Sequence, residues 1–483
     1  PGAGPAPEAV AVIARRRPPR RPGPALLGAL LLALALPGAL LLTLAPLAAG
    51  GGAGAGEGRE TVAVHDAAGL RQALRSAGPG TTIELAAGEY LSPFRLEGLQ
   101  GTAQAPIVIT GPAAGEPAVL LGRRGANTLS LVNTAHVVLR HLTLDGRRRN
   151  ISAVVAEADG DAAHHITLEH LEIRHYDSDQ GNTGITTRVP AWAWTIRRNV
   201  IHHVGTGLYL GQPGGRAPFI GGLIEHNFIA ATRGYNAQIK HQGVRPALPG
   251  MPHEPQRTVI RYNAFSKAGH SNPERPRPNL LVGHWPPSGP GARDRYLIYG
   301  NLFYENPHER LFQGEGNVAL YNNLLVNRSG DALLMTPHNG VPETVHILHN
   351  TVLAAGFGIR IDRPAPEREQ RIAGNAVFAA EPLERAPGVT VSDNYTGAQA
   401  EAAARLAAPQ AGLAGLDLYP RRPGALRRDE PLALRVDLPG LGRDYNHRRR
   451  REPTWGAYAG GEPRNPGRPA DIGPRVPGCR PCR

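Results

Sequence analysis

The chain has 483 residues, a formal net charge of +13 and only 5% aromatic residues. Its 60 glycines and 46 prolines exclude a fold dominated by long helices. Its two cysteines, Cys479 and Cys482, exclude a disulfide framework and form one weak zinc-like CxxC pattern. Residues 1–56 and 401–483 carry net charges of +4 and +7, which leaves +2 for the residues between them. Because the basic excess lies outside the central region, we predict no nucleic-acid partner.

Residues 1–56 are predicted to contain a signal peptide or membrane anchor followed by a linker. Five arginines between positions 15 and 21 precede an uncharged, Leu- and Ala-rich stretch at 25–49, as in secretory signals. The stretch is also long enough to be a membrane anchor, although its prolines disfavour one unbroken helix. Residues 53–55 resemble a small-residue cleavage site. We therefore expect a secreted, periplasmic or cell-surface protein, with membrane contact only if this segment is retained.

Residues 57–125 are predicted to form an N-terminal cap and the first coils. Residues 67–77 have the pattern of an amphipathic helix, followed by short apolar strands. A helix at this end would cover the open edge of the first coil, which would otherwise pair with other chains.

Residues 126–400 repeat a short unit in which Asn or His separates two apolar strands. Strands of three to five residues stack well as the rungs of a solenoid, and an Asn amide at a fixed turn can hydrogen-bond to the next rung. The pattern therefore predicts a parallel, all-β solenoid with a structural column of these side chains: His141, His170, Asn199, Asn227, Asn263, Asn301, Asn323, Asn350 and Asn375.

The repeats and the segments GLRQALRSAGPGTTIELAAGEY and GTAQAPIVITG resemble a known family over roughly residues 60 to 400. They are similar to the pectate lyase-like superfamily and, within it, to the chondroitinase B and alginate lyase polysaccharide lyases. The resemblance implies a single-stranded right-handed parallel β-helix. In the Pro- and Arg-rich tail at 401–483, the segments at 444–446 and 456–458 are similar to the end of many bacterial β-helix proteins, so we expect part of the tail to pack on the helix.

The longest repeat intervals, 36 and 38 residues, predict inserted loops, and long loops on a regular scaffold usually carry function. If Ile239 faces inward, Gln238 and Lys240 face outward, and by alternation Gln313 and Glu315 could share that face. Polar and aromatic side chains on these neighbouring coils could bind sugars. The expected substrate-binding residues are Tyr235, Gln238, His241, Arg245, Trp285, Tyr304, Gln313 and Glu315.

Lys240 is the predicted catalytic base. β-Elimination from a uronate needs a cation at the carboxylate, a base for the C5 proton and an acid at the leaving oxygen. Only Lys240 and Lys267 are lysines among 53 basic residues, and a desolvated lysine can lose its proton whereas arginine cannot. The resemblance also implies a lysine base at this strand, while Lys267 is expected to be a solvated loop residue. Arg233 is predicted to neutralise the carboxylate and His284 to act as the acid.

The match to the family is incomplete at its metal and acid positions. Arg233 and Tyr235 stand where the resemblance implies acidic calcium ligands, and the strand NLLVGH lacks the arginine implied as the acid. We therefore predict no metal site or cofactor with assigned ligands, and calcium stays an open alternative. The pairs His164–His165 and His202–His203 are expected to be ladder or surface residues.

Three functions remain open. The first is β-elimination on an acidic, uronate-containing polysaccharide by an exported monomer. The second is C5-epimerisation, which shares the proton abstraction but returns a proton. The third is glycan binding or a surface-structural role without catalysis. Paired outward aspartates, which hydrolysis of a polygalacturonate would require, are not found on these strands.

Overall fold

The computed structural model describes residues 60–384, 386–434 and 436–467. The chain divides into two units, 1–55 and 56–483, and every described residue belongs to the second. The predicted signal or anchor segment therefore lies outside the described residues, as does the CxxC pattern at Cys479 and Cys482. Within the described ranges, no helix combines the length and the apolar composition needed to span a membrane.

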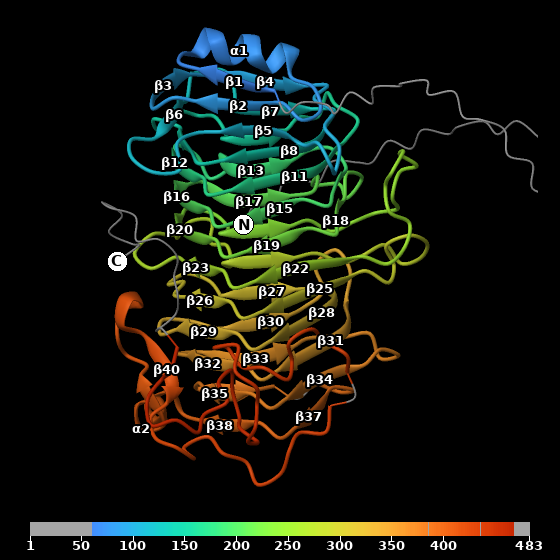
Figure 1. Cartoon of the computed structure of the whole chain (residues 1–483). Helices are drawn as coiled ribbons and strands as arrows, with labels where there is room; N and C mark the ends of the chain where they lie inside the picture. Colours follow the sequence, from blue (N-terminus) through green and yellow to red (C-terminus); the bar gives the residue numbers. More distant parts are fainter. Residues whose placement is uncertain (1–59, 385, 435, 468–483) are drawn as a thin grey trace, which may run out of the picture. The chain divides into compact units, whose positions relative to one another are not determined.

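Three parallel sheets, called A, B and C here, surround one core, and the chain visits them in that order on each turn (Figure 1). This is the predicted right-handed parallel β-helix. Sheet A has 15 strands, of which β14 and β18 lie off the main path. Its strands are β1 (Thr61–Val64), β2 (Thr82–Leu85), β5 (Ile107–Thr110), β8 (Thr134–Arg140), β11 (Ala163–Glu169), β14 (Ala191–Trp192), β15 (Thr195–Arg197), β18 (Phe219–Ile220), β19 (Leu223–Glu225), β22 (Arg257–Arg261), β25 (Arg295–Tyr299), β28 (Gly316–Tyr321), β31 (Pro342–Leu348), β34 (Gln370–Ala373) and β37 (Thr390–Ser392).

Sheets B and C have 12 and 11 strands. Sheet B consists of β3 (Gly88–Leu91), β6 (Ala118–Leu121), β9 (Leu142–Asp145), β12 (Glu172–Tyr176), β16 (Val200–Val204), β20 (Phe228–Thr232), β23 (Ala264–Ser266), β26 (Leu302–Tyr304), β29 (Leu324–Asn327), β32 (Thr351–Ala354), β35 (Ala376–Phe378) and β38 (Tyr395–Gly397). Sheet C consists of β4 (Phe94–Glu97), β7 (Leu129–Val132), β10 (Val154–Ala156), β13 (Thr183–Thr187), β17 (Thr206–Leu210), β21 (Ala237–Ile239), β24 (Leu280–Val282), β27 (Phe312–Gly314), β30 (Leu333–Met335), β33 (Phe357–Ile361) and β36 (Glu381–Leu383).

Side chains from all three sheets fill the interior. Ile239, Val282 and Phe312 of sheet C belong to the same buried cluster as Ile298 of sheet A and Phe303 of sheet B. Alternate residues of each strand face outward because successive side chains point to opposite faces of a sheet. Since apolar side chains occupy the bore, polar chemistry is confined to the outer faces.

A helix covers the first rungs, as the sequence predicts. Helix α1 (Ala67–Ser76) buries Leu70, Ala73 and Leu74, and the Asp66 side chain accepts a hydrogen bond from the Gly69 backbone nitrogen at 2.7 Å. An N-terminal cap of this kind satisfies one of the free amides of the first helical turn.

The asparagine column runs between sheets A and B. From Asn199 to Asn394, each Nδ2 donates to the Oδ1 of the next asparagine at 2.8–3.0 Å. Asn394 extends the predicted column by one rung. The rings of His141 and His170 stack at 4.9 Å. The structural interpretation is therefore confirmed for the asparagines. His141 and His170 were wrongly placed in their column, because Glu169 pairs with Arg197 and the backbone nitrogen of Leu171 is the group that donates to Asn199 Oδ1. The two histidines lie one residue earlier and form a separate stack.

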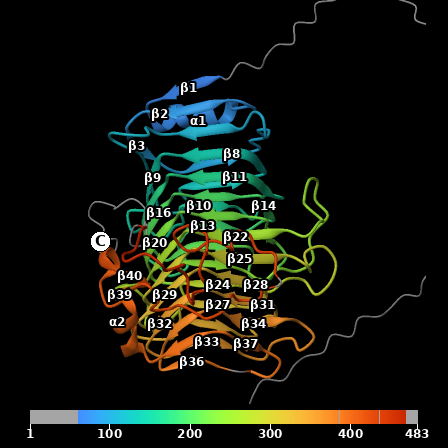
Figure 2. The same ribbon diagram turned by 60° about the horizontal axis from the view of Figure 1, so that its bottom comes forward.

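The C-terminal segment packs on the outer face of sheet B (Figures 1 and 2). It begins with two short helices, η1 (Gln399–Glu401) and α2 (Ala402–Arg405), and continues through β39 (Leu406–Ala408), η2 (Leu413–Gly415) and β40 (Asp417–Pro420). The antiparallel pair β39–β40 and the residues Tyr419 and Tyr458 bury apolar surface against Val326 and Phe378. Further along, Leu438 packs with Tyr299 of sheet A, and the Tyr321 hydroxyl donates to the carbonyl oxygen of Pro439 at 2.7 Å. The segment therefore covers later rungs of sheets A and B.

Candidate functional site

A groove of about 620 Å³ lies on the outer face of sheet C. Its floor is formed by Thr186, Tyr209 and Gln238, which are paired across three successive strands, β13, β17 and β21. Their inward neighbours Ile185 and Leu208 are fully buried, so alternation directs these polar side chains outward. Gln238 and Tyr235 are the predicted substrate-binding residues that line this groove.

Lys240 lies at the edge of the groove, directly after β21. Gly211 precedes it on the neighbouring rung, where an added Cβ would lie 3.2 Å from the Cβ of Lys240. Gly283 follows it on the other side, where an added Cβ would lie 2.2 Å from the backbone nitrogen of His241. Glycine at these two positions therefore lets the neighbouring rungs pack closely against Lys240 and His241.

The Lys240 ammonium has no hydrogen-bond or ion-pair partner within the described part of the chain. Burial lowers its pKa from the usual 10.5, while the charge of Glu315 opposes this effect. A lysine with a lowered pKa and an unengaged nitrogen is the arrangement that general-base chemistry requires. The outward direction predicted for Lys240 is confirmed.

Four cationic side chains line the groove: Lys240, Arg188, Arg275 and Arg277. Among the described residues that line it, none is Asp or Glu. Arg188 donates to Glu157 behind the rim at 3.2 Å, whereas the guanidinium of Arg277 lies over the ring of Tyr235 at 5.7 Å. The site therefore favours an anionic ligand, and its lining offers no carboxylate oxygen to calcium.

Two tyrosines face the groove beside these cations. Burial raises the pKa of Tyr209 above its usual 10.0, and the neighbouring Tyr235 raises it further. Burial also raises the pKa of Tyr235. Both hydroxyls are therefore protonated at neutral pH and can each donate a proton or a hydrogen bond.

The three arginines, His338 and Tyr209 were not predicted from the sequence. Tyr209 could have been found, because the register Tyr209–Gln238 follows from applying the same alternation one rung earlier. Arg275 and Arg277 lie on the irregular loop between β23 and β24, which no periodic pattern describes.

Lys267 anchors this loop and is not the solvated residue that was expected. Its side chain is fully buried, and its Nζ donates to the carbonyl oxygens of Gly234 and Arg277, each at 2.8 Å. Burial lowers its pKa to about 7. Lys267 thus ties the backbone that carries Arg277 to the end of β20.

Three predicted substrate-binding residues are corrected by their burial. Arg245, whose side chain is 1% exposed, forms an ion pair with Asp294. Trp285 is 1% exposed and stacks on Tyr296 in the core at 4.3 Å. Tyr304 belongs to sheet B, where Arg328 and the C-terminal segment cover it. None of these side chains is available to a sugar on sheet C.

The side chains of Glu315 and Gln313, also predicted to bind substrate, form hydrogen bonds within the protein. The two carboxylate oxygens of Glu315 accept hydrogen bonds from the backbone nitrogens of His284, His338, Asn339 and Gly340 at 2.8–3.2 Å. Glu315 therefore fixes the turn that brings His338 to the groove. Gln313 accepts a hydrogen bond from Arg310 at 3.1 Å.

The remaining catalytic candidates lie outside the groove lining. The ring of His284 stacks on His241 at 5.3 Å, and its Nδ1 lies 2.7 Å from the carbonyl oxygen of Trp285. Arg233 donates to the carbonyl oxygen of Asp177 at 3.2 Å. The structure thus brings Lys240 together with Tyr235 and not with the predicted acid or the predicted cation.

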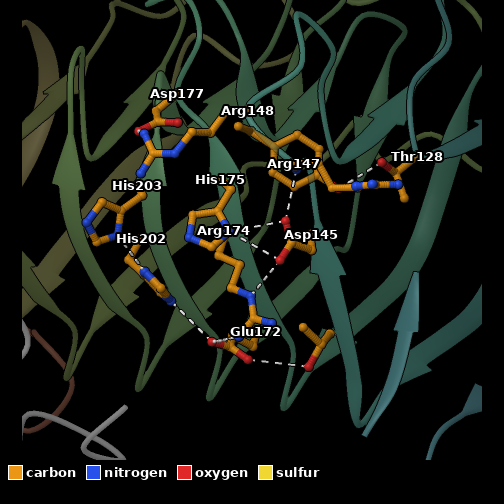
Figure 3. Close-up of polar contacts among 12 residues, drawn as sticks. Thr128, Asp145, Arg147, Arg148, Glu172, Arg174, His175, Asp177, His202 and His203 are labelled. Atoms are coloured by element: carbon orange, nitrogen blue, oxygen red, sulfur yellow. Dashed lines mark hydrogen bonds and ion pairs between the residues drawn. The ribbon is translucent and has the colours of Figure 1, made fainter. Parts of the chain in front are cut away.

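A second polar cluster occupies the outer face of sheet B (Figure 3). Arg174 pairs with both Asp145 and Glu172 at 3.0 Å, and His202 lies 3.2 Å from Glu172. His175 pairs with Asp145 at 3.1 Å. Because these charges satisfy one another across neighbouring rungs, this cluster has the properties of a stabilising ladder.

Comparisons with known proteins give similarities of fold. No protein-family model matches the sequence, and no curated protein is similar to it. An alginate lyase from Paenibacillus sp. str. FPU-7 is 16% identical with a TM-score of 0.40, over 70% of this chain and 99% of that one. The A-module of the mannuronan C-5 epimerase AlgE4 from Azotobacter vinelandii is 18% identical with a TM-score of 0.48, over 70% and 93%. The GH136 lacto-N-biosidase from Eubacterium ramulus is 12% identical with a TM-score of 0.46, over 70% and 68%. At these values none of them assigns an activity to this chain.

Proposed function

We propose that this chain is a lyase that cleaves an acidic, uronate-containing polysaccharide by β-elimination in the groove on sheet C. The observation that carries the proposal is the groove's composition, with an unengaged lysine, three arginines and two protonated tyrosines, and no Asp or Glu among the described residues lining it. A polyanion gains from the cations, and the sugar rings can lie against Tyr209 and Tyr235. Export through residues 1–56 belongs to the same proposal.

The roles follow from the chemistry of each group. Arg277, and Arg275 beside it, bind the carboxylate of the uronate and stabilise the charge that develops there. Neutral Lys240 takes the C5 proton. The electron pair of the broken C5–H bond forms the C4–C5 double bond as the bond between C4 and the glycosidic oxygen breaks. Tyr209 gives its hydroxyl proton to that oxygen. Transfer of the proton from Lys240 to Tyr209 then restores both groups, so the reaction needs no added reactant.

Hydrolysis is less well supported by the groove. Glycoside hydrolysis in its common form uses two carboxyl groups that flank the scissile bond. The described lining of the groove supplies none, and the carboxylates of Glu157 and Glu315 are engaged by Arg188 and by backbone amides.

A C5-epimerase would share Lys240 but return a proton to the opposite face of the sugar. A panel of alginate, pectate and glycosaminoglycans separates the alternatives. An ultraviolet absorbance of unsaturated products indicates a lyase. A changed uronate composition without cleavage indicates an epimerase, and binding without either change indicates a glycan-binding protein.

The matched variant is Lys240→Arg, which keeps the positive charge but cannot act as a base at neutral pH. We expect this variant to bind the polysaccharide that the wild type cleaves, with wild-type affinity, and to form no unsaturated product. Product formation by Lys240→Arg at the wild-type rate would contradict the proposal.

A further inference from the structure

Three histidine side chains gather on sheet A, away from the groove. His136 belongs to β8, and His164 and His165 belong to the neighbouring strand β11. The register places His136 opposite His165, and their rings stack at 4.3 Å. The Nδ1 atoms of His164 and His165 lie 2.8 Å apart. None of the three lines the groove on sheet C.

The backbone explains why consecutive residues of a strand meet. His136 and His165 have φ angles of +51° and +54°, in the left-handed region, so the alternation of β11 is interrupted between His164 and His165. His164 is held from the other side, because its ring stacks on the buried Trp192 at 4.3 Å. The scaffold therefore holds all three rings in place before any ligand arrives.

The spacing of the nitrogens suits one metal ion. One ligand nitrogen from each of the three rings lies within 4.8 Å of the others, and no other set of three His, Cys, Asp or Glu within the described ranges meets this condition. Zinc binds imidazole nitrogen at about 2.0–2.1 Å, so its ligands lie at most about 4.2 Å apart. Small rotations of the rings would bring the nitrogens to that distance.

The pair His202–His203 differs from the three-histidine set in the partners of its ring nitrogens. His202 and His203 also have their Nδ1 atoms 2.8 Å apart, but the other nitrogen of His202 is engaged by Glu172 in the charged cluster on sheet B (Figure 3). Within the described part of the chain, the His164 and His165 side chains hydrogen-bond only to each other, and the His136 side chain has ring contacts but no hydrogen bond. Their remaining nitrogens are therefore available.

The type of donor atom indicates which metal ions fit this geometry. Neutral imidazoles are the form that binds metal. Nitrogen donors without a carboxylate favour zinc, copper, nickel or cobalt over calcium and magnesium, which prefer oxygen.

We propose that His136, His164 and His165 bind one divalent transition-metal ion of the zinc type. His165 is exposed and His136 and His164 are half-buried, so the remaining coordination position faces solvent and water can fill it. The ion would join β8 to β11. This site is independent of the proposed lyase function, because its residues are not part of the groove.

The test is a calorimetric titration of tag-free, chelator-treated protein with Zn²⁺ alone. Cys479 and Cys482 are replaced by serine in every sample, so that the CxxC pattern cannot bind the metal. We expect one ion per chain. His136→Asn and His165→Asn keep a residue that tolerates a positive φ, and His164→Phe keeps the ring on Trp192. Each should weaken binding at least about tenfold, the loss that even an outer partner of a metal ligand can cause.

The matched control is His170→Asn. His170 also has a left-handed φ, of +53°, and a stacked ring, but it lies outside the three-histidine set. It should bind Zn²⁺ as the wild type does. Electron paramagnetic resonance of the Cu²⁺-loaded parent protein gives a readout that does not depend on the folding of any variant, and it should show coupling to imidazole nitrogens. Absence of stoichiometric binding, equal weakening by His170→Asn or a spectrum without nitrogen coupling would overturn the proposal.

Discussion

Removal of one asparagine from the middle of the column tests what holds the rungs together. The Oδ1 of Asn323 accepts hydrogen bonds from the backbone nitrogen and the Nδ2 of Asn301, at 2.9 and 3.0 Å. Its own Nδ2 donates to Ile298 at 2.9 Å and to Asn350 at 3.0 Å. In Asn323→Ala the buried Asn301 amide loses its acceptor, which lowers the free energy of unfolding by about 1–3 kcal/mol. Loss of the hydrogen bond to Ile298 lowers it by about 1 kcal/mol more. The free energy of unfolding should therefore fall by about 2–4 kcal/mol.

Asn394 is the matched control at the last rung. It accepts the same pair of bonds from Asn375, at 2.8 and 3.0 Å, but it is only half-buried. Water can replace it, so Asn394→Ala should cost only about 1 kcal/mol. Equilibrium urea denaturation followed by circular dichroism compares the two variants. If the midpoint of Asn323→Ala falls no further than that of Asn394→Ala, the buried column does not stabilise the coil in the way argued here.

Three further predictions concern the groove. Tyr209→Phe should lower kcat by about a hundredfold with little change in KM, because it removes the proton donor; an unchanged kcat would exclude that role. Arg277→Ala should raise KM about tenfold or more, since a charge-assisted bond contributes about 1.5–3 kcal/mol, and a KM that stays constant would separate the arginine from the substrate. The wild-type rate should rise with pH, with a midpoint at the Lys240 pKa, which lies below 10.5, because only neutral Lys240 accepts a proton. The rate should fall only above pH 10, where Tyr209 ionises. A rate that falls between pH 6 and 9 would contradict these assignments.

The regular part of this molecule was predictable from its sequence. Each rung repeats the same local rule, so the asparagine column and the alternation that directs Gln238 and Lys240 outward could be seen without a structure. Tyr209 was missed although the same rule gives its direction, because the prediction began at the rung with the long insertion.

The irregular part could not be predicted in this way. Arg245 and Trp285 lie in long connections, where the chain turns back to bury an ion pair and an aromatic ring. Arg277 lies on such a connection as well, but its side chain lines the groove. The buried Lys267 fixes this loop by donating a hydrogen bond to the carbonyl oxygen of Arg277. These contacts join residues without a repeating spacing, so no periodic pattern distinguishes the buried Arg245 from Arg277, which lines the groove.

The central claim is that Lys240 removes the C5 proton, and chemical rescue tests it most directly. Lys240→Ala should form unsaturated product at least about a hundredfold more slowly than the wild type, the contribution expected of a general base. Added small primary amines should restore part of the rate in Lys240→Ala, more so as the pH approaches the pKa of the amine, and should leave the wild-type rate unchanged. Undiminished product formation by Lys240→Ala without amine would contradict the account.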